Sequence, residues 1–533
     1  MWPYAARQLL QQGNAKKSLE GQLVFFDDHS GSGGQWAVRS TQGKLSSLGK
    51  GVKPPKKDKD GNDVQPGSTI ALTCPTDVNG DCSFVSSSDL LLLAGVPPPT
   101  ADSVLENMLV MITDFSACDG GAAWTAGATV DAATRAVLGP NADGNGGVAQ
   151  AVGLCSYGRV QISTATFTAI VVQPACVAGM ATTCDFLSIA NNADVAATAL
   201  LGDAAFASFS RYVYVLPSAY TSVCTWQGMS ALPGKQFWLQ PTSNGMNRWA
   251  TVLQEWIHNF GLFHAWQGGV EYADLSSAMG RGSACPNAAE LARLNWASAA
   301  PGGAALSSAG LAPAAPVTFT LPATYLTGTG AYVRVTPDWA TTGKNLYLAV
   351  RVPKQADAGL GAAYANALNV HEVNAAIDNA VVAGTGGWYQ DRQVSFLSAA
   401  TLSTRVVVSG YNLVVYSGAW VGTDFMRVHM CRYLKADTEC PTLDTLEARF
   451  RPSPPRPPPS PSPPSPPSPK PPTPPPPSPR PPAPSPPPSP TPPSPRPMPP
   501  SPAPRPPSPG PGPPSPAPRP PSPPPPPKSS KGR

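Results

Sequence analysis

The sequence predicts an α+β protein of 533 residues, in which a mixed central region is flanked by β-rich regions and followed by a Pro-rich tail. Three observations support this fold class. Between residues 101 and 300, apolar runs typical of buried strands alternate with segments of helical periodicity. Short β-like runs bounded by Gly, Ser and Pro come before and after this region. From Arg451 onward the chain is mostly Pro and Ser.

We therefore divide the chain into four parts. They are a β-rich N-terminal domain (1–100), a central domain (101–300), a β-sandwich-like domain (301–450) and a disordered tail (451–533). In the first part, strands are expected at Leu19–Phe26, Gln35–Ser40 and Ser68–Thr73. In the third part, they are expected at Val317–Leu321, Ala331–Val335, Leu346–Val352, Val394–Leu397, Arg405–Ser409 and Tyr411–Tyr416.

The central part alternates strands and helices. Strands are expected at Asn107–Phe115, Val160–Ser163, Phe167–Gln173 and Tyr212–Leu216. Helices are expected at Asp131–Leu138, Asp194–Ala207, Asn247–Phe260 and Ala288–Asn295. The helix at 247–260 repeats Trp, Val, Leu and Ile at helical spacing, which predicts a face packed against the core.

The ten cysteines favour a secreted protein. None forms a CxxC pair, so disulfides in an oxidising compartment fit them better than a zinc cluster. Cys176 with Cys184, and Cys431 with Cys440, are close enough in the sequence to form local loops. Met1–Leu10 lacks the apolar region of a signal peptide. We interpret this as a missing or truncated start, with a cytosolic protein as the alternative.

Charge and hydropathy exclude two classes of partner. Ten Lys and Arg residues and no acid lie from Arg451 onward, so a net charge of +5 for the chain leaves −5 for the rest. The basic excess therefore belongs to the tail, and no nucleic-acid-binding face is predicted. No apolar run reaches the length of a membrane span.

One segment, QEWIHNFGLFHA at residues 254–265, combines groups that can bind and use a metal ion. Gln254 and His258 are four residues apart, so on a helix both side chains lie on one face and can reach a single ion. Gly261 is expected to take positive φ and end the helix, which turns His264 back as a third ligand. Three protein ligands with an open fourth position describe a catalytic zinc site.

Glu255 directly follows the first expected ligand, where a carboxylate is suited to act as general base. The segment resembles HExxHxxGxxH, the signature of the metzincin metalloproteases. Its part HNFGLFHA, followed by Met279 in SSAMG, is similar to the gametolysin family of green algae. The order of SYG, RYVYVLP and WQG earlier in the chain resembles the same family. The resemblance implies a metzincin-like fold, Zn²⁺ held by Gln254, His258 and His264, and Met279 in a turn beneath the metal.

Gln254 departs from the family's pattern, which has His at this position, although the resemblance extends to volvocine algal members that carry Gln there. An amide oxygen is a weaker and harder donor than imidazole, so zinc affinity should fall and copper becomes a second candidate. Two residues after Met279, where the pattern would have an oxyanion-binding Tyr, the chain has Arg281. Asp274 either orients a ligand or caps a turn.

The resemblance also suggests that the N-terminal domain is a propeptide that covers the cleft. Cys74 or Cys82 would then bind the metal and keep the enzyme latent, and the alternative is a disulfide between them or to another cysteine. The other histidines, His29, His371 and His429, have no companion at ligand spacing. We interpret them as surface or hydrogen-bonded residues.

The tail is too poor in apolar residues to form a core and is expected to adopt polyproline II. Its SPP and SPPP repeats resemble hydroxyproline-rich glycoproteins of plant and algal walls, which implies hydroxylation and O-glycosylation. Its cations are suited to hold acidic polysaccharide. The alternatives are an unmodified linker or a ligand of Pro-binding modules.

Together these observations predict an extracellular zinc endopeptidase that cleaves cell-wall or extracellular-matrix glycoproteins, with Glu255 as general base. Two alternatives stay open. The first is a catalytically inactive, protease-like structural protein of the matrix, because Gln254 weakens the site. The second is a metal-dependent binding module.

Overall fold

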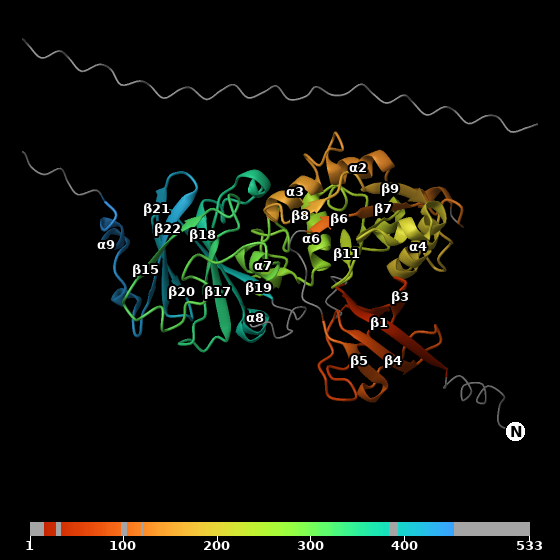
Figure 1. Ribbon diagram of the computed structural model, residues 1–533, viewed down its shortest axis with the longest axis horizontal. Helices are drawn as coiled ribbons and strands as arrows, with labels where there is room; N and C mark the ends of the chain where they lie inside the picture. Colours follow the sequence, from red (N-terminus) through yellow and green to blue (C-terminus); the bar gives the residue numbers. More distant parts are fainter. Residues whose placement is uncertain (1–14, 28–33, 97–103, 119–120, 383–392, 452–533) are drawn as a thin grey trace, which may run out of the picture. The chain divides into compact units, whose positions relative to one another are not determined.

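The computed structural model describes residues 15–27, 34–96, 104–118, 121–382 and 393–451. The chain separates into two compact units, residues 1–453 and 454–533, and every described residue belongs to the first. Helices and strands are both abundant in it, which confirms the α+β class (Figure 1). The predicted Pro-rich tail, Met1–Leu10 and His29 lie outside the described residues.

Five antiparallel strands form the N-terminal sheet, in the order β3-β2-β1-β4-β5 (red to orange in Figure 1). They are β1 (Lys16–Phe26), β2 (Gln35–Arg39), β3 (Leu45–Ser47), β4 (Thr69–Pro75) and β5 (Leu90–Ala94). The three strands expected here are confirmed, and β3 and β5 are additional. Side chains of β1 alternate between two buried faces. Leu23 packs in the sheet's own core, whereas Val24 and Phe26 pack with residues of the central region.

A five-stranded sheet in the order β11-β12-β10-β7-β9 is the base of the central region. Its strands are β7 (Met108–Thr113), β9 (Thr168–Val172), β10 (Arg211–Val215), β11 (Gly228–Ser230) and β12 (Gln236–Leu239). Strands β9, β7, β10 and β12 are parallel, and β11 is an antiparallel edge strand. A separate parallel pair joins β6 (Val104–Glu106) to β8 (Val160–Ile162). All four strands predicted for this region are confirmed.

Helices cover both faces of the central sheet. Three of them, α2 (Val130–Leu138), α3 (Val148–Cys155) and α6 (Trp249–His258), share a core with one face of β7, and α4 (Phe186–Leu201) shares a core with the other. The remaining helices of this region are α5 (Asp203–Ala207) and α7 (Ala288–Arg293). The sheet therefore holds α6, the helix of the predicted metal site, by its apolar side.

The prediction of a single helix at Asp194–Ala207 is wrong in two respects. The helix α4 begins eight residues earlier, after Asp185, whose side chain accepts a hydrogen bond from the Ser188 amide at 3.0 Å and caps it. Gly202, with φ 84°, then ends α4 before α5 begins.

Two sheets pack face to face in the C-terminal sandwich, as expected. The first has the order β14-β13-β19-β18-β17-β16 and the second β15-β22-β21-β20. Their inner faces share one apolar core. The strands are β13 (Ala265–Gln267), β14 (Val270–Glu271), β15 (Val317–Pro322), β16 (Tyr332–Val335), β17 (Lys344–Arg351), β18 (Ala367–Asn374), β19 (Val394–Thr401), β20 (Thr404–Val408), β21 (Leu413–Val421) and β22 (Phe425–Arg432), and the helices are α8 (Ala375–Val382) and α9 (Leu443–Ala448). The sequence did not predict β18, β22, or the entry of β13 and β14 into this sheet.

All ten cysteines form disulfides. The pairs are Cys74–Cys82, Cys118–Cys176, Cys155–Cys285, Cys184–Cys224 and Cys431–Cys440. The predicted pair Cys431–Cys440 is confirmed, and Cys176–Cys184 is wrong. The reason is that β7 and β9 are adjacent parallel strands, so the segments that follow their carboxyl ends, with Cys118 and Cys176, meet at one edge. The pairing of Cys74 with Cys82 also rules out either thiol as a latent metal ligand.

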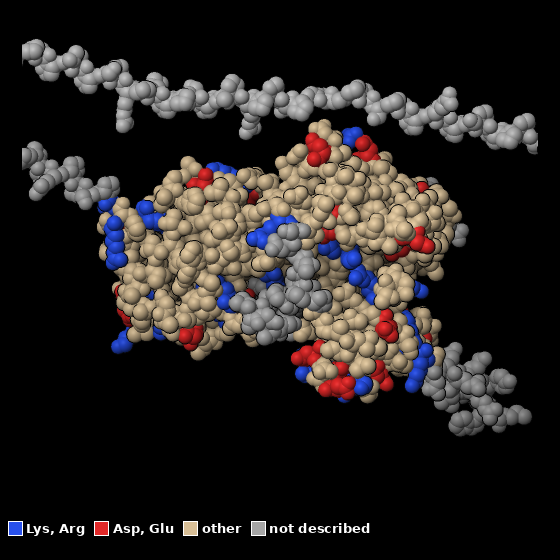
Figure 2. All heavy atoms as spheres, viewed as in Figure 1, with Lys and Arg blue, Asp and Glu red and all other residues tan. Residues whose placement is uncertain are grey.

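Two features of the structure concern the predicted partners: the charges on the surface and the length of the apolar helices. On the face shown in Figure 2, acidic and basic side chains lie side by side over the N-terminal region and are scattered elsewhere. The expectation that nucleic acid is not a partner stays a prediction. Within the described residues, no helix combines the length and apolarity that crossing a membrane requires.

Candidate metal-binding cleft

Helix α6 carries three of the predicted site residues. Leu253, Trp256 and Ile257 pack in the core beneath it, which fixes the rotation of the helix about its axis. Gln254, Glu255 and His258 are on the same two turns, with 7%, 2% and 3% of their surfaces exposed. The helix ends at His258, two residues before the predicted Phe260, and Gly261 has the predicted positive φ, 85°.

His258 and His264 lie edge to face, with their ring centroids 4.7 Å apart. Each ring makes a short contact through Nδ1. In His258 this atom is 2.6 Å from the carbonyl oxygen of Leu262, and in His264 it is 2.9 Å from Oε1 of Glu271. The carboxylate of Asp27 is 3.4 Å from the same Nδ1 of His264. The turn at Gly261 therefore brings the two histidines together.

Gln254 and Glu255 line a cleft of about 690 Å³. The other lining residues are Thr225, Trp226, Gln227, Gly228, Asn244, Arg248, Thr251, Val270, Glu271, Tyr272, Gly280 and Arg281. Oε2 of Glu255 has no hydrogen-bond partner within the described residues. A Cβ atom on Gly228 would come within 2.4 Å of Oε1 of Glu255, so only glycine allows β11 to approach this carboxylate so closely.

Burial and nearby charges shift two pKa values at this cleft. Burial raises the pKa of Glu255 to about 8, although the His264 cation partly opposes the shift. For His264 burial acts in the opposite direction, but hydrogen bonds to Asp27 and Glu271 outweigh it and raise the pKa to about 9. Acidic neighbours therefore favour the protonated imidazole when no metal competes for it.

Met279 lies directly beside the segment that follows His264. Its carbonyl oxygen accepts a hydrogen bond from the Ala265 amide at 2.9 Å, and its side chain is completely buried in the core that contains α6. The Met279 amide donates to Oγ of Ser277 at 3.1 Å, and Ser277 in turn donates to Glu290 at 2.5 Å. The turn is thus fixed on both sides.

Other candidates of the sequence analysis have structural partners. Asp274 accepts a hydrogen bond from the Ser276 amide at 2.8 Å and pairs with His371 at 3.2 Å, so it caps a turn. His371 and His429 are buried and hydrogen-bonded, the latter to Glu447 at 3.0 Å. Arg281, which stands where the family's pattern would have Tyr, lines the cleft.

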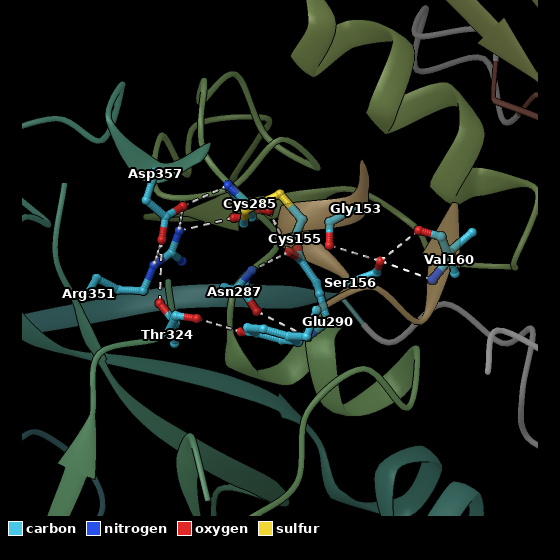
Figure 3. The surroundings of a disulfide bond; sticks show 12 residues. Gly153, Cys155, Ser156, Val160, Cys285, Asn287, Glu290, Thr324, Arg351 and Asp357 are labelled. Atoms are coloured by element: carbon cyan, nitrogen blue, oxygen red, sulfur yellow. Dashed lines mark hydrogen bonds and ion pairs between the residues drawn. A yellow bond between two sulfur atoms is a disulfide. The ribbon is translucent and has the colours of Figure 1, made fainter. Parts of the chain in front are cut away.

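A disulfide and a buried ion pair hold the segment after the Met279 turn (Figure 3). Cys285 is bonded to Cys155 at the end of α3. Its amide donates to Asp357 at 2.8 Å, and its carbonyl accepts from Arg351 at 3.1 Å. Arg351 and Asp357 pair with each other at 2.8 Å and are at most 1% exposed. Two residues of the C-terminal region therefore hold the main chain at Cys285, a few residues after Arg281 of the cleft.

Asp27, Glu271 and Tyr272 were missed by the sequence analysis. Among the described residues, Asp27, His264 and Glu271 form the group of His, Cys and acidic side chains whose ligand atoms all lie within 4.8 Å of one another. The ring of Tyr272 is 4.0 Å from that of His264. The Gly-Gly pair at 268–269 was a detectable signal for Glu271, because two glycines favour a tight hairpin that brings it back toward His264. No sequence pattern near Asp27 indicated that this residue belongs to the site.

Comparison with known proteins first gives the class of protein, which is a peptidase. The chain belongs to the gametolysin peptidase M11 family, whose model matches residues 107–410, more than half of the chain. The autolysin of Chlamydomonas reinhardtii is 31% identical over 96 residues, which is 16% of this chain and 15% of that protein. The chain thus matches a small part of this relative's length. No solved structure matches the chain.

Proposed function

We propose that the protein is a metal-dependent endopeptidase whose active site is the cleft beside α6. The observation that carries this proposal is the carboxylate of Glu255, which is 2% exposed, lines the cleft and has one oxygen without a hydrogen-bond partner in the described chain. Leaving a buried acceptor unpaired is costly, so this oxygen requires an explanation, and a bound water or a catalytic role would supply one. Membership of a peptidase family supports the same conclusion.

The donor atoms near Glu255 fit a zinc ion. His258 and His264 each make a hydrogen bond through Nδ1, and a neutral imidazole bonded in this way binds a metal through Nε2. Gln254, four residues before His258 on α6, offers its amide oxygen as the third donor. Two nitrogens and one oxygen suit zinc, and copper is the second candidate because of its higher place in the affinity order.

A metal at this position would make bound water more acidic and polarise the carbonyl of the bond to be cleaved. The chain's own contribution is proton transfer. Glu255 takes a proton from the attacking water and later delivers it to the leaving amine. Gly228 keeps β11 against this carboxylate and so limits its movement. Arg281, at the edge of the same cleft, is the candidate for contacting the charge that develops on the carbonyl oxygen.

We propose proteins of the cell wall or extracellular matrix as substrates, with Pro-rich glycoproteins as the first class to test. The name of the relative, autolysin, supports this substrate class. Five disulfides support an extracellular site of action. The basic Pro-rich tail is then a wall-embedded spacer that holds acidic polysaccharide.

The first experiment measures the metal content of purified protein by mass spectrometry, for the wild type, Gln254→His and His258→Ala. The proposal expects close to one zinc or copper ion per wild-type chain and its loss in His258→Ala. An empty wild type together with a metal-loaded Gln254→His would overturn it. That result would favour the catalytically inactive matrix protein instead, because Gln254 is the residue that departs from the family's pattern.

The second experiment tests Glu255 itself. Glu255→Gln should retain the metal but lose peptide cleavage by about 10²-fold or more, because it removes the general base. Glu20→Gln, which changes an exposed acid on β1, is the matched control and should cleave normally. Equal cleavage by Glu255→Gln and the control would refute this role. A wild type that binds metal without cleaving any peptide would favour the binding module.

A further inference from the structure

We propose that Glu271 and Asp27 are positioning residues that together hold His264 in the orientation and tautomer needed to bind the metal. This inference rests on the proposed function and deepens it. It also extends the site beyond the region that matches the peptidase family, because Asp27 directly follows β1 of the N-terminal sheet and lies outside residues 107–410.

Glu271 is placed by a tight hairpin. His264 is followed at once by β13, and β14 returns antiparallel to it, with Glu271 opposite Trp266. Gly268 and Gly269 form the two-residue turn, with φ of 60° and 79°. As a result, Oε1 of Glu271 reaches Nδ1 of His264 at 2.9 Å. On its other side β13 pairs with β19, so the hairpin cannot easily shift.

Asp27 is placed by the end of β1. Phe25 exchanges two main-chain hydrogen bonds with Leu232, at 2.8 and 3.0 Å, and Phe26 is completely buried among side chains of the central region. The ring of Phe25 also stacks on that of Phe263, the residue before His264, with centroids 6.2 Å apart. These contacts fix the chain just before Asp27, whose carboxylate comes within 3.4 Å of Nδ1 of His264.

Both carboxylates approach the same ring nitrogen, and this decides their role. A carboxylate that accepts the Nδ1–H bond of a histidine leaves Nε2 as the metal-binding atom and increases its basicity. The cleft beside Gln254 and Glu255 is lined by residues between Thr225 and Arg281, and no described residue of the N-terminal sheet is among them. Asp27 therefore contacts His264 without lining the cleft, whereas Glu271 does both.

The arrangement also compensates for a weak first ligand. Gln254 contributes a neutral amide oxygen, so the two histidines must supply most of the affinity for the metal. Two negative charges on one imidazole strengthen that ligand more than one would. Of the two, Glu271 is closer to Nδ1, at 2.9 Å against 3.4 Å, so we expect it to contribute more than Asp27.

The experiment measures the dissociation constant for Zn²⁺ by competition with a chromophoric chelator, in full-length wild type, Glu271→Gln, Asp27→Asn and the double variant. We expect Glu271→Gln to weaken zinc binding by about 10-fold and the double variant by up to about 100-fold, with Asp27→Asn in between wild type and Glu271→Gln. Glu20→Gln, which removes an equal charge from β1 at an exposed site, is the control and should bind zinc like the wild type.

A second readout separates positioning from a general structural effect. With Co²⁺ in place of Zn²⁺, the visible absorption of the double variant should differ from that of the wild type, whereas the far-UV circular dichroism of the metal-free proteins should be equal. If the wild type, both single variants and the double variant all bind zinc equally tightly, the inference is overturned but the proposed function is not. A wild type that binds no zinc or cobalt would overturn the proposed function as well.

Discussion

The N-terminal sheet and the C-terminal sandwich both pack apolar side chains on the central region, but the attachment of the sandwich also includes a buried pair of Arg and Asp. The N-terminal sheet buries apolar side chains of its outer face, among them Val24, Phe26 and Leu45, in a core that it shares with the central sheet. The sandwich is joined by strand pairing between β13 and β19 and by the buried pair of Arg351 with Asp357 on the main chain of Cys285.

This difference predicts how each attachment fails. Apolar packing loses free energy in proportion to the surface and volume removed. A buried ion pair responds more abruptly, because removal of one partner leaves a charge without compensation in a medium of low polarity. The two attachments meet at His264. The N-terminal attachment ends at Asp27, which contacts His264, and the sandwich attachment begins at β13, which directly follows His264.

The largest effect is expected at the ion pair of the sandwich. Asp357→Asn keeps the shape of the side chain but leaves the Arg351 cation buried and uncompensated, so unfolding free energy should fall by about 4 kcal/mol. Denaturant unfolding measures this. Lys354→Met is the control, because the pair of Lys354 with Asp424 is 46% and 21% exposed, so solvent screens it and it should contribute less than about 1 kcal/mol. Similar losses of unfolding free energy in both variants would contradict the distinction between the fully buried pair and the partly exposed one.

At the N-terminal attachment, Phe26→Ala should cost about 3 kcal/mol, because it opens a cavity between Phe186 and Trp238, which now pack edge-on against this ring. Thermal and denaturant unfolding give the value. Phe84→Ala, in the same N-terminal region but 62% exposed, should change stability by no more than about 0.5 kcal/mol. If Phe26→Ala proved equally harmless, the sheet would not depend on its shared core.

A polar contact at the same attachment should have a smaller effect. The side chain of Asn191 accepts a hydrogen bond from the Leu45 amide at 2.9 Å and donates one to the Leu45 carbonyl at 2.8 Å. Asn191→Ala should therefore cost about 1–2 kcal/mol in unfolding free energy. Its neighbour Asn192 bonds only to Ala175, within the central region, so Asn192→Ala is the matched control and should cost less.

The smallest effect concerns pH. Burial raises the pKa of the Asp194 carboxyl to about 7, above an unfolded value of about 3.9. The folded state thus binds this proton more tightly, which favours folding in acid and is lost as the pH rises through 7. Asp194→Asn should become more stable relative to wild type between about pH 4 and pH 8. Because Asp194 also lines a hollow of about 410 Å³ beside Arg39, we expect less than about 1 kcal/mol.

Unfolding of both proteins at the two pH values measures this difference. Glu20→Gln serves as the control, because an exposed acid should give no difference between them. A relative stability of Asp194→Asn that does not change with pH would mean that the carboxylate is fully solvated in the folded protein.

The sequence was informative where a signal is local. The periodicity of α6 and the glycine after it were sufficient to predict the helix, its end and the return of His264. The start of α4 was missed because Asn191 and Asn192 are poor helix formers, and their value lies in contacts with Leu45 and Ala175 that only the fold creates. Strand pairing between distant segments places Asp27 beside His264, so no pattern in the sequence could have included it.

The pairing of β13 with β19 has a consequence for how the protein can be divided. The three residues after His264 find their strand partners at Val394, Ser395 and Phe396, far beyond the boundary at residue 300 that the sequence suggested. A shortened protein ending at that boundary would leave the β13–β14 hairpin with an unpaired edge, and Glu271 with it. The smallest fragment that preserves the cleft therefore extends at least to the end of β19. The cleft and the C-terminal sandwich should accordingly be expressed as one unit.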